Sequence, residues 1–115
     1  MAVIETGENQ KKLVLQSHYY KASYEEIKKV YVEILEELNY DIVSVNDDYT
    51  EIYAEVPHME VIAKIIEQDV KETSIDFYIN SDYMFGSKGK AEKFIQEVYN
   101  KIEQKYEFKG VSLHK

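Results

Sequence analysis

Two amphipathic stretches with helical spacing flank a long central stretch with strand spacing, and this order constrains the fold more than any other feature of the sequence. From Ser23 to Asn39, apolar residues recur at intervals of three and four, which places them on one stripe of a helix. The same spacing recurs from Ser87 to Tyr106. Both stripes are narrow, so each helix is expected to bury one side only.

A capping box marks the start of the first helix. The Ser23 hydroxyl can accept a hydrogen bond from the backbone N–H of Glu26, whose side chain can reach back to the Ser23 amide. Acidic side chains at Glu25 and Glu26 also suit the positive end of the helix dipole.

The rest of the chain reads as strands. Apolar and polar residues alternate over residues 51–56 and 75–80, the period of two expected of half-buried strands. Residues 12–20 and 42–45 are predicted as further strands. Residues 59–68 fit two patterns: a helical stripe with Pro57 near its first turn, or a β-branched strand that returns through a hairpin at Asp69. The β-branched content favours the strand.

The resulting order, β-α-β-β-β-β-α, predicts an α+β two-layer sandwich with an antiparallel sheet of about five strands and two helices on one face. We expect residues 1–10 to form a flexible N-terminus, residues 11–106 a single domain, and residues 107–115 a tail with room for one added strand. The predicted centre of the core is Ile34, Leu38, Phe77, Phe94 and Val98.

The charge excludes one broad class of partner. The 115-residue chain has 22 acidic residues against 14 Lys and no Arg, giving a formal net charge of -8. A surplus of this size argues against binding to nucleic acid or to anionic membranes. It also predicts that any partner protein is basic rather than acidic. No Cys is present, which excludes disulfides, thiolate zinc sites and Cys nucleophiles.

The sequence also gives expectations for location and membranes. The first ten residues contain no basic segment followed by an apolar one, so no signal peptide is expected and the cytoplasm is the predicted compartment. The longest apolar runs are far shorter than the roughly 20 residues that a membrane span needs.

The segment Thr73–Ile79, followed by Phe85-Gly86 and a helix near Ala91, resembles the last strand and Phe-Gly turn of a known domain type. The chain from Lys12 to Tyr106 is similar to the small bacterial β-α-β(4)-α domains of unknown function with TBP-like topology. The resemblance implies the fold and brings no catalytic residues. Several such domains are exported lipoproteins, but this chain lacks their signal and cysteine, so an envelope location does not carry over.

Residues Gly86 to Ala91 form a candidate anion site. They follow a strand and open a helix, where backbone N–H groups can hold an anion. The nucleotide-binding loop needs four residues between its glycines and a Ser or Thr after its Lys; here two residues intervene and Ala91 follows. We therefore predict a tight turn with, at most, a weak anion site formed by Ser87, Lys88, Gly89 and Lys90.

Acidic turns and histidines are the only metal-ligand candidates, and neither predicts a metal or a cofactor. Residues 47–55 and Asn80 with Asp82 lack the ligand order of a calcium loop, so Asx turns explain them better. His18, His58 and His114 are too dispersed for a local zinc motif.

Tyrosine is unusually frequent, with 11 residues. Tyr53 and Tyr78 alternate with the apolar rows of their strands, so they should point away from the helices. Residues 59–68 would place beside them either Val61, Ala63 and Ile65 or the set Ile62, Lys64 and Ile66. We take the second set, which with Tyr53 and Tyr78 forms a candidate interface on the open face of the sheet.

Three functions follow. The first is a non-catalytic protein-interaction module, acting on a partner or on a second copy through the open face. The second is a small-ligand carrier that binds between the sheet and the second helix. The third is a hydrolase with paired carboxylates; an enzyme is disfavoured because no nucleophile elbow and no Arg clamp is present.

Overall fold

The computed structural model describes residues 2–8, 10–82 and 86–111, which form two α-helices, one short 3-10 helix and a sheet of seven strands. In chain order the elements are β1 Ala2–Glu5, η1 Leu13–Leu15, β2 His18–Tyr20, α1 Tyr24–Glu37, β3 Asp41–Asn46, β4 Glu51–Val56, β5 Met59–Asp69, β6 Glu72–Ser81, α2 Ser87–Glu103 and β7 Phe108–Val111. The predicted α+β two-layer class is confirmed, and β2 to α2 reproduce the predicted element order.

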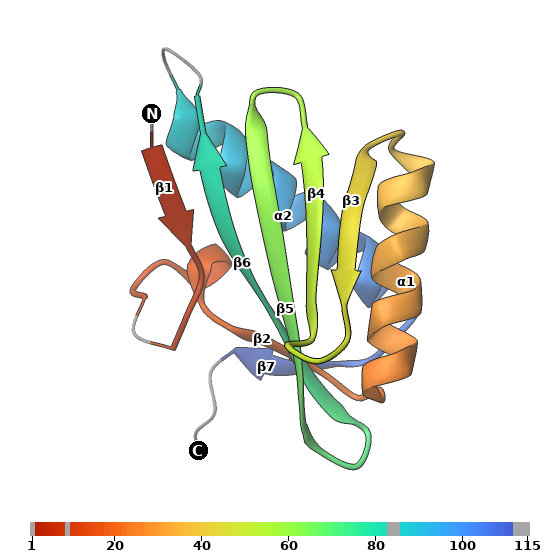
Figure 1. The fold of residues 1–115 in the computed structure, drawn as a ribbon. Coiled ribbons are helices and arrows are strands. Elements are labelled where there is room, and N and C mark those ends of the chain that lie inside the picture. The colour runs from red at the N-terminus through yellow and green to blue at the C-terminus, as the bar shows by residue number, and fades with distance from the viewer. Residues whose placement is uncertain (1, 9, 83–85, 112–115) are drawn as a thin grey trace.

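The sheet topology explains why both helices lie on one face. The strand order is β3-β4-β5-β6-β2-β7, with every neighbouring pair antiparallel, so β2 is parallel to β3 and β6 is parallel to β7. Helices α1 and α2 connect these two parallel pairs. The β2–α1–β3 and β6–α2–β7 connections cross the sheet in opposite directions, and their first strands, β2 and β6, also point in opposite directions. Crossovers between parallel strands are right-handed, so the two reversals cancel and both helices lie on the same face. Figure 1 views the sheet from the uncovered side, with α2 crossing behind the strands.

Both helices start and pack as their sequence predicts. Ser23 caps α1: its side chain accepts from the backbone N–H of Glu26, at 3.2 Å, while the Glu26 carboxylate accepts from the Ser23 amide, at 2.9 Å. The apolar stripes of α1 and α2 are buried. Two ion pairs, Lys101–Glu37 and Lys105–Glu33, connect the helices across their exposed edge.

Strand β6 is the hub of the sheet because β1 and β2 both pair with the same edge of it. β1 pairs with residues 78–81 and β2 with residues 73–75. Between them, the Asp76 carboxylate accepts from the hydroxyls of Thr6, at 2.6 Å, and Ser17, at 2.8 Å. Thr6 also accepts from the backbone N–H of Phe77 and donates its own N–H to the Phe77 carbonyl. The chain therefore leaves β6 after Thr6 and returns to it at Ser17.

This arrangement corrects three sequence predictions. Residues 2–5, expected within a flexible terminus, form β1. Residues 12–20 do not form one strand: residues 13–15 are a 3-10 turn with Leu15 buried, and only residues 18–20 pair. The sheet has seven strands rather than about five, because β1 and β7 extend it. Both are four residues long, too short to show a pattern in the sequence.

The strand reading of residues 59–68 is confirmed, since β5 pairs with β4 and β6 along its length. Pro57 lies in a two-residue hairpin turn, where its fixed φ suits the first position. His58 takes the second position with a φ of 63°. At the other end, β5 turns into β6 through Val70 and Lys71, as the sequence predicted.

Aromatic rings fill the space between the layers. Phe77 on β6 meets Tyr31 of α1 and both Phe94 and Tyr99 of α2, with ring centroids 5.7–6.1 Å apart. The predicted core residues Ile34, Phe77, Phe94 and Val98 are buried. Leu38 is only partly buried because it caps the C-terminal end of α1 rather than lying within its stripe.

His18 belongs to this core. It is 7% exposed and stacks on Tyr99, with ring centroids 3.6 Å apart. Its Nδ1 lies 2.8 Å from the Gln16 carbonyl, which can only accept, so Nδ1 carries the proton. Burial lowers the pKa of His18 below its ordinary value of 6.5; the hydrogen bond to Gln16 and the charge of Glu103 oppose this shift.

The packing of Phe94 predicts a large loss of stability on truncation. Phe94→Ala leaves a cavity beside Phe77, and we expect the free energy of unfolding to fall by about 3–5 kcal/mol in urea titrations. Lys93→Ala, one residue away and exposed, is the control and should change it by less than about 0.5 kcal/mol. A loss below about 1 kcal/mol for Phe94→Ala would contradict the described packing.

The bridging role of Asp76 predicts a second loss. Asp76→Ala leaves the Thr6 and Ser17 hydroxyls without their acceptor, so we expect a decrease of about 1–3 kcal/mol in the free energy of unfolding. Asp76→Asn retains an acceptor oxygen and should lose less. Equal losses for the two variants would show that the contribution of Asp76 comes from its negative charge and not from its acceptor oxygen.

The burial of His18 predicts a pH effect. The folded pKa is lowered, so the unfolded chain binds this proton more readily, and the stabilisation present above pH 6.5 is lost as the pH falls through the folded pKa. His18→Phe keeps a ring against Tyr99 and should flatten the stability profile just below pH 6.5, where the unfolded chain takes up the proton first. His58→Gln is the control, since that side chain is 63% exposed. An unchanged slope in His18→Phe would disprove the effect.

Candidate functional site

The open face of the sheet brings the predicted interface residues together. Tyr53 on β4 pairs with Ile62 on β5, and Ile62 pairs with Tyr78 on β6, so the three form one row across adjacent strands. We call these three residues the tyrosine row. Tyr78 is 42% exposed, and the other two are half-buried. Neither helix covers them, because both helices lie on the opposite face (Figure 1).

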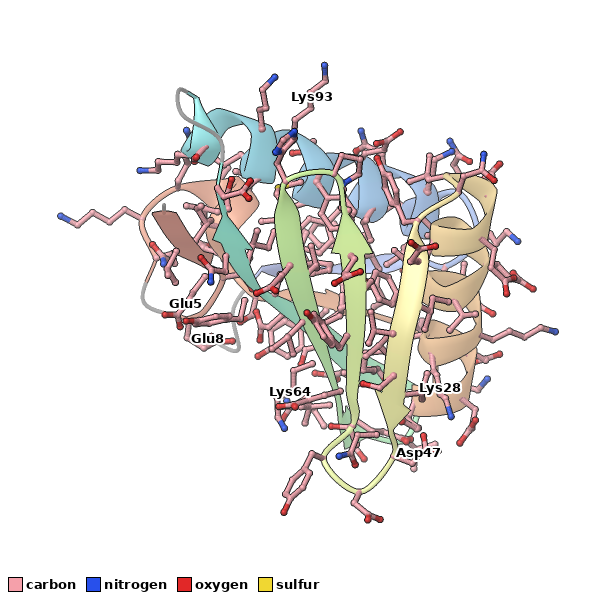
Figure 2. All side chains as sticks on the ribbon, turned by 45° about the horizontal axis from the view of Figure 1, so that its top comes forward. Glu5, Glu8, Lys28, Asp47, Lys64 and Lys93 are labelled. Atoms are coloured by element: carbon pink, nitrogen blue, oxygen red, sulfur yellow. The ribbon has the colours of Figure 1, made fainter. Side chains whose placement is uncertain are left out.

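The structure decides between the two sets that the sequence left open for β5. Val61, Ala63 and Ile65 are fully buried under the helices. Ile62, Lys64 and Ile66 therefore occupy the open face, as predicted. Lys64 lies one row from the tyrosine row, opposite Glu51 and Asp76, and Ile66 lies one row further, opposite Ser74. Figure 2 looks onto this face and labels Lys64.

A row of acidic side chains borders the tyrosine row on its other side. Asp41 on β3 pairs with Glu55 on β4, and Glu55 pairs with Glu60 on β5. We call Asp41, Glu55 and Glu60 the acid row; the sequence analysis missed it. In the sequence, Glu55 and Glu60 stand two positions from Tyr53 and Ile62, which predicts that they share the open face. Only the strand pairing shows that they lie in one row.

The tyrosine and acid rows are connected by one hydrogen bond. The Tyr53 hydroxyl donates to the Glu60 carboxylate, at 3.2 Å. Partial removal from water raises the pKa of Tyr53, and the bond to Glu60 raises it further. Tyr53 therefore stays a neutral donor at physiological pH.

A shallow groove lies beside the acid row, at the end of the sheet. It has a volume of about 680 Å³ and is lined by the three acid-row residues together with Tyr40, Met59 and Asn80 among others. The Asn80 side-chain oxygen is buried and accepts no hydrogen bond. His58 and Asp82 stand at the rim, with the His58 Nδ1 3.1 Å from the Asp82 carboxylate.

The candidate anion residues Ser87, Lys88, Gly89 and Lys90 form the first turn of α2. Gly86 precedes them with a φ of 74°, a left-handed conformation that favours glycine. The Lys90 N–H donates to the Gly86 carbonyl, at 2.9 Å, which is the first hydrogen bond of the helix, so this N–H is already used within the helix. Phe85, named in the family resemblance, lies outside the described residues. Anion binding here stays a prediction.

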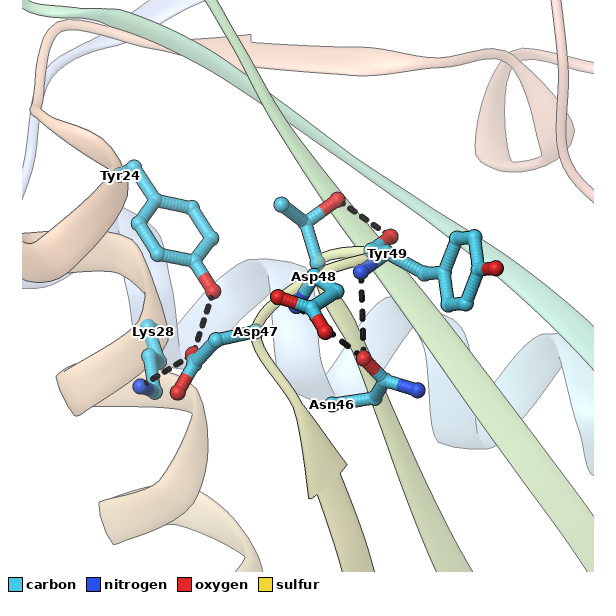
Figure 3. A network of polar contacts seen from close by, with 7 residues as sticks. Tyr24, Lys28, Asn46, Asp47, Asp48 and Tyr49 are labelled. Carbon is cyan, nitrogen blue, oxygen red and sulfur yellow. Dashed lines mark hydrogen bonds and ion pairs between the residues drawn. The ribbon is translucent and has the colours of Figure 1, made fainter.

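The acidic turn between β3 and β4 is held by local hydrogen bonds. The Asn46 side chain accepts from the backbone N–H groups of Asp48 and Tyr49, which makes the predicted Asx turn. Asp47 accepts from the Lys28 ammonium, at 2.6 Å, and from the Tyr24 hydroxyl, at 3.0 Å, both on α1 (Figure 3). These contacts lower the pKa of Asp47, with Lys28 as the larger cause. The turn thus secures the edge strand to α1.

No group of three His, Asp or Glu side chains is placed to hold a metal ion within residues 2–8, 10–82 and 86–111. His18 is in the core and His58 at the groove, while His114 lies outside the described residues. Across that same part of the chain, no helix combines the length and apolar character that crossing a bilayer requires.

The geometry does not favour the other two functions. A carrier would need space between the sheet and α2, but Phe94, Val98 and Tyr99 are packed there with at most 4% exposure. A hydrolase needs one carboxyl in an apolar setting that raises its pKa. The cross-strand carboxylates Glu55 and Glu60 both face water.

No protein-family model, no curated protein and no solved structure matches this chain. The resemblance to TBP-like β-α-β(4)-α domains therefore stays a prediction.

Proposed function

We propose that this chain is a non-catalytic protein-interaction module that binds a protein through the open face of its sheet, in the cytoplasm as its sequence predicts. The tyrosine row carries the proposal. Two tyrosines and an isoleucine stand in register on three adjacent strands, on the side that the helices leave uncovered. Tyr side chains supply large contact areas at a low entropic cost and are enriched at interfaces.

The rest of the structure supports a binding role over a catalytic one. The apolar side of the sheet is fully used by the two helices, so the open face is not needed to build the core. Tyr78 and Ile66 are 42% and 37% exposed on this face. A row of exposed apolar and aromatic groups that the fold does not need marks an interaction surface.

The tyrosine row predicts that one charge placed in it abolishes binding. Tyr78→Glu puts a carboxylate into the tyrosine row, so affinity capture from a lysate of the native host should recover about tenfold less partner than the wild-type chain does. A differently tagged copy of the chain, added to the lysate, reports self-binding in the same experiment. Captured proteins are quantified by mass spectrometry.

Tyr49→Glu is the matched control, because Tyr49 is 66% exposed in the β3–β4 turn and lies outside the row. It should capture the same proteins as the wild-type chain. Circular dichroism checks that both variants fold. Equal capture by Tyr78→Glu and the wild-type chain would refute the proposal.

A further inference from the structure

We infer that the open face binds a different protein, one that presents Lys or Arg side chains beside an apolar strip, and not a second copy of this chain. This inference rests on the proposed function and specifies the partner of the same face.

The three carboxylates of the acid row form no ion pair with any described residue. Among the ion pairs between described residues, Glu33 and Glu37 of α1 pair with Lys105 and Lys101. By contrast, Asp41, Glu55 and Glu60 form none within the described part of the chain. The acid row therefore carries part of the negative charge of the molecule, and no lysine among the described residues neutralises it there.

The row on the other side of the tyrosine row does not offset it. Lys64 is its only cation, and its ammonium already contacts the Tyr49 carbonyl, at 2.7 Å, and the Glu51 carboxylate, at 3.7 Å. Asp76 in the same row accepts from Thr6 and Ser17. Glu5, at the β1 end of the tyrosine row, adds another carboxylate (Figure 2). The apolar centre thus has acidic groups on three sides.

A second copy cannot complement this pattern. In a two-fold face-to-face contact, the acid row of one copy meets either the acid row of the other or the row that contains Lys64. The first arrangement opposes three carboxylates with three. The second opposes them with Glu51, Asp76 and one lysine that is already paired. Like charges at contact distance each cost on the order of 1 kcal/mol even in water, so self-association through this face is disfavoured.

A basic partner fits the same pattern. Its apolar side chains would cover the tyrosine row, and its Lys or Arg heads would reach the acid row and the groove beside it. The same groove is lined by all three acid-row carboxylates, which an ammonium or guanidinium group can pair with. Charge complementarity of this kind raises association rates and sets specificity.

The test uses defined peptides and the intact chain. The first peptide has ten residues that alternate Lys with Ile and Tyr, and the second has the same charge with Ser in place of the apolar residues. Binding is followed by NMR on the ¹⁵N-labelled chain at about 50 mM and about 300 mM salt, which shortens the Debye length from roughly 14 to 6 Å. We expect the first peptide to shift the amides of the tyrosine and acid rows, to bind about fivefold more tightly than the second, and to weaken in the higher salt.

Matched double variants separate the face from the overall charge. Glu55→Gln with Glu60→Gln should weaken the first peptide about fivefold, because both substitutions lie in the acid row. Glu36→Gln with Glu97→Gln removes the same charge from exposed helix positions and should weaken it less than about twofold. Equal effects of the two pairs, or equal affinity of the two peptides, would overturn the inference.

Self-association gives the remaining decisive outcome. Sedimentation of the chain alone should show a monomer at about 50 µM, the range of weak interfaces. A dimer that Tyr78→Glu dissociates would show that a second copy occupies the face; it would overturn this inference and leave the proposed function standing. Capture that is insensitive to Tyr78→Glu, by contrast, would remove the proposed function itself.

Discussion

The pairing of three strands with β6 is the constraint on which the rest of the structure depends. β5 pairs along one edge, while β1 and β2 share the other, joined through the Asp76 carboxylate and the hydroxyls of Thr6 and Ser17. This placement of β2 makes it parallel to β3, and the later addition of β7 to β2 makes β7 parallel to β6. Both helices then become crossovers of the same hand and cover the same face. The uncovered face exists because of this topology.

Burial on one face leaves the other free to carry function. The side chains between the layers are close-packed aromatics and aliphatics, including a neutral His18 stacked on Tyr99. Because side chains alternate along a strand, the residues next to those that point toward the helices in β4, β5 and β6 point to the open face. The tyrosine row is thus a direct consequence of where the core lies. The acid row beside it gives the face an apolar centre bordered by negative charge, and under the proposed function this charge selects a basic partner.

Local patterns predicted the elements whose signal is carried by neighbouring residues. The capping box at Ser23, the stripes of both helices and the alternation in β4 and β6 each depend on spacings of two to four residues, and all are confirmed. The strand at residues 59–69 was harder, because β-branched residues at helical spacing satisfy both patterns. Its pairing on both edges decides the conformation, and that pairing is made with β4 and β6, which lie outside the segment whose pattern is ambiguous.

The sequence by itself determined the two-layer class, the element order from β2 to α2, and the outward position of Tyr53 and Tyr78. The tertiary structure alone decided that β1 and β7 join the sheet, that residues 13–15 form a 3-10 turn that buries Leu15, and that Asp41, Glu55 and Glu60 form one row. Period and capping are properties of a single segment, whereas register is a relation between two strands and depends on how the turn between them aligns their residues. A row across the sheet has no signature until the strands that build it are aligned.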